Sequence, residues 1–131
     1  MTDIVDLNKV LSNSPGHRRK SHGKFVLISR GEQEWFVLGV PKHYPYHATL
    51  VAAFCDRESL PYHWERRPDI VRIEHTFTSI DGGGMFELDR EAGILRLGGE
   101  SRAYGPVNHR DLLALASGLG TPLDLTVIVG G

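Results

Sequence analysis

Cysteine and long apolar runs are both scarce in this sequence. Cys55 is the one cysteine among 131 residues, so no disulfide can form within the chain, and its apolar neighbours predict a buried thiol. No stretch approaches the roughly 18 apolar residues of a membrane-spanning helix, and residues 1–11 lack the apolar segment of a secretory signal. We therefore expect a cytoplasmic protein without a membrane partner.

An excess of charge of either sign is also missing. The chain has 15 Lys and Arg residues against 16 Asp and Glu residues, which gives a formal net charge of -1. Binding to nucleic acid usually needs a basic surface, so nucleic acid is not among the expected partners. A chain of this length forms one domain, and a hydrophobic content of 40% can supply its core without a metal. We expect a monomer.

Two parts are expected along the chain: a flexible N-terminal arm over residues 1–23 and a folded domain over residues 24–131. Residues 12–23 are rich in polar and turn-forming residues and show no apolar periodicity. The basic cluster at 17–20 could contact a phosphorylated partner or nucleic acid, although short clusters of this kind are usually only solvated.

Apolar patterns predict a sheet and two helices. Short β-branched runs and period-two alternation predict strands at 25–28, 35–40, 71–78, 85–88, 94–97 and 123–129. One helix should begin near Pro45 and a second should follow a cap at Asn108, whereas Asp81–Gly84 should form a turn. The fold class is therefore α+β, a single domain with a central mixed sheet of about six strands flanked by two helices.

The start of the first helix is the first candidate for chemistry. A helix N-terminus presents unpaired N–H groups and partial positive charge, so His47 and the amide of Ala48 would face any phosphate bound there. His47 would then be a titratable base beside an anion. The alternative is a histidine that only packs at the helix start.

Two further segments suit an oxyanion. The loop from Ser101 to Pro106 combines a hydroxyl with small residues that let backbone N–H groups approach a ligand, although it could also be an ordinary connection. Lys24 lies at the edge of a predicted strand, where it could add a positive charge to a site or simply be solvated.

Common catalytic and metal-binding motifs are missing. The sequence has no phosphate-loop, dinucleotide-binding or nucleophile-elbow motif. His43 and His47 have the spacing of a helical zinc pair, but a helix that begins at Pro45 would leave His43 outside the helix. We therefore expect neither a metal nor a cofactor.

Taken together, these segments resemble the Janus/Ocnus family of phosphohistidine phosphatases from about residue 24 to residue 129. The loop Ser101-Arg102-Ala103-Tyr104-Gly105-Pro106, with His109 three positions further on, is similar to the family's Ser-Met-Ala-Tyr-Gly-Pro followed by a helix with histidine at that spacing. The other matches are Lys24-Phe25-Val26-Leu27-Ile28 with the family's opening strand, Lys42 through Tyr46-His47-Ala48 with its Lys-x-x-x-Tyr-His-Ala, and Gly82-Gly83-Gly84 with its triple glycine.

The resemblance implies a metal-independent phosphatase that hydrolyses the P–N bond of phosphohistidine on a protein or peptide. It makes His47 the base that activates water, with direct attack by His47 on phosphorus left open. It assigns phosphate binding to Lys24, the Ala48 amide, the Ser101 hydroxyl and the Ala103 amide, and leaves possible support to Tyr46, Tyr104, Gly105 and His109. Arg102, also placed at the phosphate, replaces the family's methionine, and residues 71–80 lack the cysteine-rich segment of animal members, so the resemblance leaves substrate selection open. Residues 57–69 have no counterpart in the family.

Two other functions remain open. A non-catalytic module could bind phosphorylated protein through the same donors, because oxyanion donors serve recognition as well as catalysis. A nucleic-acid-binding protein could use the basic arm, although the near-neutral net charge argues against it.

Overall fold

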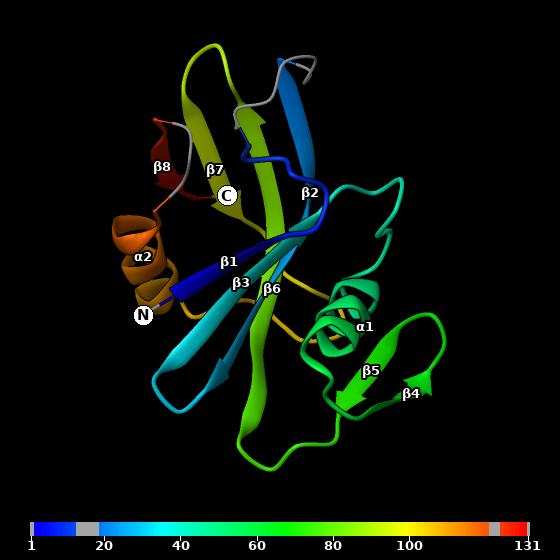
Figure 1. Cartoon of the computed structure of the whole chain (residues 1–131). Coiled ribbons are helices and arrows are strands. Elements are labelled where there is room, and N and C mark those ends of the chain that lie inside the picture. Colours follow the sequence, from blue (N-terminus) through cyan, green and yellow to red (C-terminus); the bar gives the residue numbers. More distant parts are fainter. Residues whose placement is uncertain (1, 13–18, 121–123, 131) are drawn as a thin grey trace.

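The computed structural model of the chain describes residues 2–12, 19–120 and 124–130. Its strands and helices are β1 (Thr2–Asp6), β2 (Lys20–Arg30), β3 (Gln33–Gly39), α1 (His47–Glu58), β4 (Tyr62–Arg66), β5 (Ile70–Ile73), β6 (Thr78–Asp89), β7 (Ile94–Gly98), α2 (His109–Gly118) and β8 (Thr126–Val129). Figure 1 shows α1 with β4 and β5 on one side of the large sheet and α2 on the other. The predicted α+β domain with a mixed sheet and two helices is confirmed.

The large sheet has six strands in the order β1-β3-β2-β6-β7-β8. Its inner strands pair antiparallel, and β1 and β8 are added in parallel at the two edges. The strands predicted at 25–28 and 35–40 are confirmed as parts of the antiparallel pair β2 and β3, and those at 85–88 and 94–97 as parts of the pair β6 and β7. The long strands β2 and β6 lie side by side at the centre, where they support the candidate site described below.

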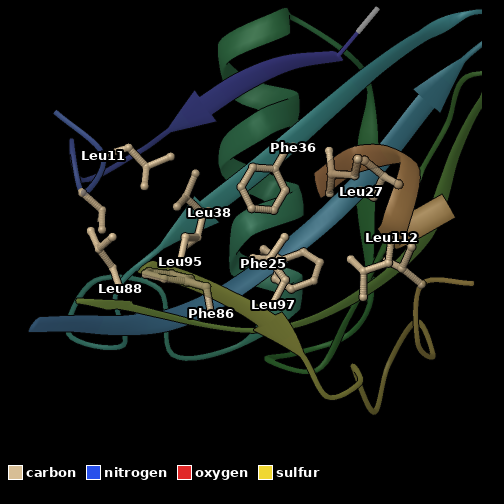
Figure 2. Packing of buried hydrophobic residues seen from close by; sticks show 13 residues of the cluster. Leu11, Phe25, Leu27, Phe36, Leu38, Phe86, Leu88, Leu95, Leu97 and Leu112 are labelled. Carbon is tan, nitrogen blue, oxygen red and sulfur yellow. The ribbon is translucent and has the colours of Figure 1, made fainter. Parts of the chain in front are cut away.

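Side-chain alternation along β2 supplies two cores. Phe25 and Leu27 point into a cluster that includes residues of α2, whereas Val26 and Ile28 point into a cluster beneath α1. Figure 2 shows the first cluster, in which leucine and phenylalanine side chains of neighbouring strands pack together with Leu112 of α2. Because both faces of the sheet centre are buried, β2 is fixed in register and can hold a functional side chain firmly.

The prediction of a flexible arm is wrong for the start of the chain. Residues 2–6 form β1, and Val5 is buried on the side of the sheet that α1 covers. The carboxylate of Asp6 accepts hydrogen bonds of 2.7 Å from the backbone N–H groups of Val10 and Leu11, and both side chains enter the core with α2. The segment can form a strand with only a few isolated aliphatic residues, because a strand at the edge of a sheet pairs with only one neighbouring strand.

The arm prediction is also wrong at its other end. The strand β2 begins at Lys20, so residues 20–23 belong to the sheet and pair with the end of β6. Their polar composition conceals the strand because part of this stretch is open to solvent. Residues 13–18 of the predicted arm, with part of the basic cluster, lie outside the described residues.

Two predictions after the first helix are wrong as well. The strand expected over 71–78 ends at Ile73, and Phe77 is 76% exposed in the loop that follows. This strand, β5, pairs with β4, which was not predicted within 57–69. The turn expected at Asp81–Gly84 is part of β6, since glycine in a strand lets other backbone approach closely.

Both helix starts agree with their predictions. The first helix begins at His47, close to Pro45, after Tyr46 in an extended conformation with φ -128 and ψ 152. The second follows Asn108, whose side-chain oxygen accepts a hydrogen bond of 2.9 Å from the backbone N–H of Arg110. The asparagine thereby satisfies one of the N–H groups that a helix start leaves without a partner.

Candidate functional site

A cavity of about 520 Å³ lies at the N-terminus of α1, between the large sheet and the two-stranded sheet of β4 and β5. Five residues predicted for the site line it together: Lys24, Tyr46, His47, Arg102 and Ala103. They come from β2, from the start of α1 and from the loop between β7 and α2. Folding thus brings to one place the three separate segments that the sequence singled out.

His47 is held as a neutral base. Its side chain is 7% exposed, and Nε2 lies 2.9 Å from the carbonyl oxygen of Gly84. A carbonyl only accepts hydrogen bonds, so Nε2 carries the proton and Nδ1 keeps its lone pair in the neutral ring. Burial lowers the pKa of His47 below its usual 6.5, the hydrogen bond to Gly84 opposes this shift, and the positive charge of Lys24 adds to it.

Gly83 lets the histidine and the serine loop meet at the sheet. A Cβ atom at this position would lie 2.6 Å from the Phe25 oxygen, 2.8 Å from Cδ2 of His47 and 3.2 Å from Cβ of Ser101. Only a residue without a side chain fits between these groups. Gly83 thus lies in β6 directly behind His47 and Ser101, and we call this position the floor of the site.

Backbone hydrogen bonds fix the serine loop, residues 101–106, on this floor. The N–H of Gly105 donates to the Ser101 oxygen at 2.8 Å, and the N–H of Gly83 donates to the Gly105 oxygen at 3.0 Å. Gly105 has a φ of 76°, a left-handed conformation that favours glycine. These contacts join the loop to β6 and hold Ala103 at the cavity wall.

Ser101 lies behind the cavity wall. It is 2% exposed, and its Oγ accepts a hydrogen bond of 3.1 Å from the backbone N–H of Tyr104. A hydroxyl that accepts one hydrogen bond still has its own proton to donate. Ser101 therefore closes the loop and remains capable of donating to a phosphate oxygen.

Tyr104 positions the loop from its far side. Its hydroxyl donates to the Val71 oxygen and accepts from the Val71 N–H, both at 2.9 Å. Burial raises the pKa of Tyr104, while the hydrogen bond to Val71 acts in the opposite direction. The hydroxyl is thus engaged with β5, and Tyr104 supports the loop without facing the cavity. His109, the first residue of α2, is exposed and also lies outside the cavity lining.

Two sources of positive charge lie beside His47. Ala48 has a buried side chain, and its backbone N–H belongs to the first turn of α1, where N–H groups have no partner within the helix. The helix dipole adds partial positive charge at the same end. Lys24 contributes a full charge from β2, where it pairs with Met85 across the sheet and lines the cavity. An anion placed beside His47 would meet both.

Sequence reasoning missed one wall of the cavity. This wall contains Arg66 at the end of β4, Asp69 in the connection and Ile70 at the start of β5. None of the three belongs to a recognisable motif. Nε of Arg66 lies 3.2 Å from Oδ2 of Asp69. Only the position of the two-stranded sheet against α1 brings these residues to the site, and no local pattern in residues 57–69 could have indicated it.

Cys55 does not line this cavity, and His43 and His47 do not form the possible zinc pair. Burial and the neighbouring charge of Asp56 raise the pKa of Cys55 to about 11, so its thiol is not a nucleophile at neutral pH. His43 lies before α1 with its Nδ1 2.9 Å from Nδ2 of Asn8, while His47 contacts Gly84. Within residues 2–12, 19–120 and 124–130, no three His, Cys, Asp or Glu side chains are grouped as metal ligands.

Comparison with known proteins adds no relative. No family model matches the chain, and no curated protein matches it. In the part of the chain that the structure describes, neither helix has the length and apolar character needed to cross a membrane.

Proposed function

We propose that this protein is a metal-independent phosphatase that hydrolyses the P–N bond of phosphohistidine on a protein or peptide. One observation carries the proposal: the neutral imidazole of His47 lies at a helix N-terminus in a cavity that Lys24 and the serine loop also line. A base and several oxyanion donors are the groups that such a hydrolysis needs, because the P–N bond is labile once its nitrogen is protonated.

In the proposed reaction, Nδ1 of His47 removes a proton from a water molecule whose oxygen attacks phosphorus. The new P–O bond forms as the P–N bond breaks, the leaving imidazole nitrogen of the substrate receives a proton from solvent, and protonated His47 returns its proton to solvent. Lys24 and the amides of Ala48 and Ala103 stabilise the charge on the phosphoryl oxygens. Direct attack by Nδ1 on phosphorus would use the same geometry and give a phosphorylated His47, which water would then hydrolyse.

The hydroxyl of Ser101 acts as one donor among several in this proposal. Arg102, on the cavity wall beside it, has a separate role that is argued below. The substrate is a phosphohistidine-containing protein of a reducing compartment, the cytoplasm, in keeping with the free and buried thiol of Cys55.

The pH dependence of kcat/KM reports on His47 in the free enzyme. The base acts when neutral, and its lowered pKa means that half of the His47 side chains are protonated only at a pH below 6.5. We expect kcat/KM to be level around neutral pH and to fall with acidification through an inflection below 6.5, after hydrolysis without enzyme is subtracted. Lys24→Met should move this inflection upward, because its charge helps to lower the pKa. An inflection above 6.5 in the unaltered protein would contradict the lowered pKa of His47.

Chelators test the metal-independent mechanism. We expect phosphate release from a phosphohistidine peptide to continue at an unchanged rate after dialysis against a strong chelator, because hydrogen-bond donors and Lys24 neutralise the phosphoryl charge in the proposed reaction. Phosphate release measured before and after dialysis, with and without added divalent ions, checks this. Loss of activity on dialysis that a single divalent ion restores would count against the proposal.

A further inference from the structure

The cavity is lined by more cationic side chains than the proposed phosphoryl site uses. Lys24, Arg66 and Arg102 all line it, together with the acids Asp69 and Glu100. In the proposed reaction, Lys24 and backbone amides hold the phosphoryl oxygens. The two arginines, which come from β4 and from the serine loop, are then available to another part of the substrate.

Arg66 is oriented for such a contact. Its Nε pairs with Oδ2 of Asp69 at 3.2 Å, while most of the side chain stays exposed. A guanidinium bound through Nε alone keeps its two terminal amino groups, which are the paired donors that a carboxylate accepts. Asp69 therefore restrains Arg66 at the cavity without occupying these donors.

Arg102 is also available. It is exposed, lines the cavity, and takes part in no ion pair within residues 2–12, 19–120 and 124–130. Its neighbours in the chain are Ser101 and Ala103, two of the proposed phosphate donors. An anion bound by Arg102 would therefore lie next to the phosphoryl group rather than at a distant surface.

We infer that Arg66 and Arg102 form a second anion site, which binds a carboxylate of the substrate beside its phosphohistidine. The inference rests on the proposed function and narrows its substrate class. Arginine suits this role because its planar fork matches the two oxygens of a carboxylate. The carboxylate belongs to an acidic residue that flanks phosphohistidine in a protein, or to the amino acid itself when phosphohistidine is free.

Four substrates test the site. Two phosphohistidine peptides differ only in Glu or Gln beside the phosphorylated residue, and free phosphohistidine is compared with its carboxamide. One of the two comparisons, peptides or small molecules, resembles the natural substrate. Within that comparison we expect KM to be about three- to tenfold lower for the substrate that has the carboxylate, as is usual for exposed arginine–carboxylate contacts. A preference within the peptides identifies a protein segment, and a preference within the small molecules identifies the free amino acid.

The variants Arg66→Met and Arg102→Met remove one guanidinium each, and Arg110→Met is the matched control. Arg110 is exposed on α2 and does not line the cavity. Its replacement therefore changes the net charge by as much as either single variant and leaves the cavity lining intact. We expect the double variant to lose the preference for the acidic substrate, so that its KM values for the acidic and the neutral substrate become equal. Arg110→Met should keep the preference, and Glu100→Gln should strengthen it by removing a competing carboxylate at the cavity.

A wild-type protein that turns over all four substrates without any preference would overturn the second anion site and leave the proposed function intact. Retention of the full preference by the double variant would also overturn the second anion site and leave the proposed function intact. If no substrate is turned over, the proposed function fails, and binding of phosphonate analogues of the Glu and Gln peptides tests the anion site alone. Equal affinity for the two analogues would then overturn the second anion site.

Discussion

Replacement of His47 by alanine is expected to lower kcat/KM for a phosphohistidine peptide by about two to four orders of magnitude, as is usual for the loss of a general base. Nδ1 is the ring nitrogen of His47 that keeps a lone pair, because Nε2 is engaged with the Gly84 carbonyl. Initial rates of phosphate release measure the effect, and circular dichroism shows whether the variant has folded. Partial rescue by added imidazole would distinguish a lost base from a disturbed structure.

The matched variant is His47→Gln. Its side-chain amide can still donate toward the Gly84 carbonyl, but it has no basic nitrogen. It should therefore fold at least as well as His47→Ala and be as inactive. If either folded variant turned over substrate at nearly the wild-type rate, His47 would have no part in the chemistry.

Gly83→Ala is expected to have the second largest effect. The added methyl would lie 2.6 Å from a backbone oxygen and 2.8 Å from the ring of His47, so the strand, the ring or the serine loop must shift. Overpacking of this kind costs about 1–3 kcal/mol of the free energy of unfolding. A displacement of catalytic groups by about 1 Å can cost on the order of a hundredfold in rate, so kcat/KM should fall by a similar factor.

Gly118→Ala is the control for this substitution. Gly118 ends α2, and an added Cβ would have no atom within 4 Å. Alanine there should leave kcat/KM unchanged and keep or raise stability by up to about 1 kcal/mol. Denaturant unfolding and kcat/KM are measured for both variants. A folded Gly83→Ala protein with wild-type kcat/KM would show that the floor of the site does not position His47.

The central part of the fold was predictable because its signals are local. The β-branched runs around Phe25 and Trp35, and the alternation on both sides of Gly93, each define a hairpin whose strands pair with sequence neighbours. The edge strand β1 was not predictable from its few aliphatic residues, since its partner β3 lies about thirty residues further along. The strand β5 ends at Ile73, where its pairing with β4 ends. The alternation within residues 71–78 cannot show this pairing.

The inner part of the candidate site also has local signals in the sequence. His47 at a helix start, Lys24 on a strand and a loop of small residues each suggested oxyanion chemistry locally, and the cavity brings them together. Arg66 and Asp69 were missed because they reach the cavity only through the packing of a separate two-stranded sheet. Ser101 and Tyr104 were named, but only the hydrogen bonds of the folded loop separate a possible donor from a support.

Phosphate release from a phosphohistidine peptide in large molar excess over the protein tests the central claim most directly. We predict that release continues for many turnovers, at a rate proportional to protein concentration, and that His47→Gln under the same conditions does not exceed hydrolysis without enzyme. If the wild-type protein bound the peptide but released no phosphate above that background, the account would be contradicted, and the cavity would serve recognition of phosphorylated protein instead.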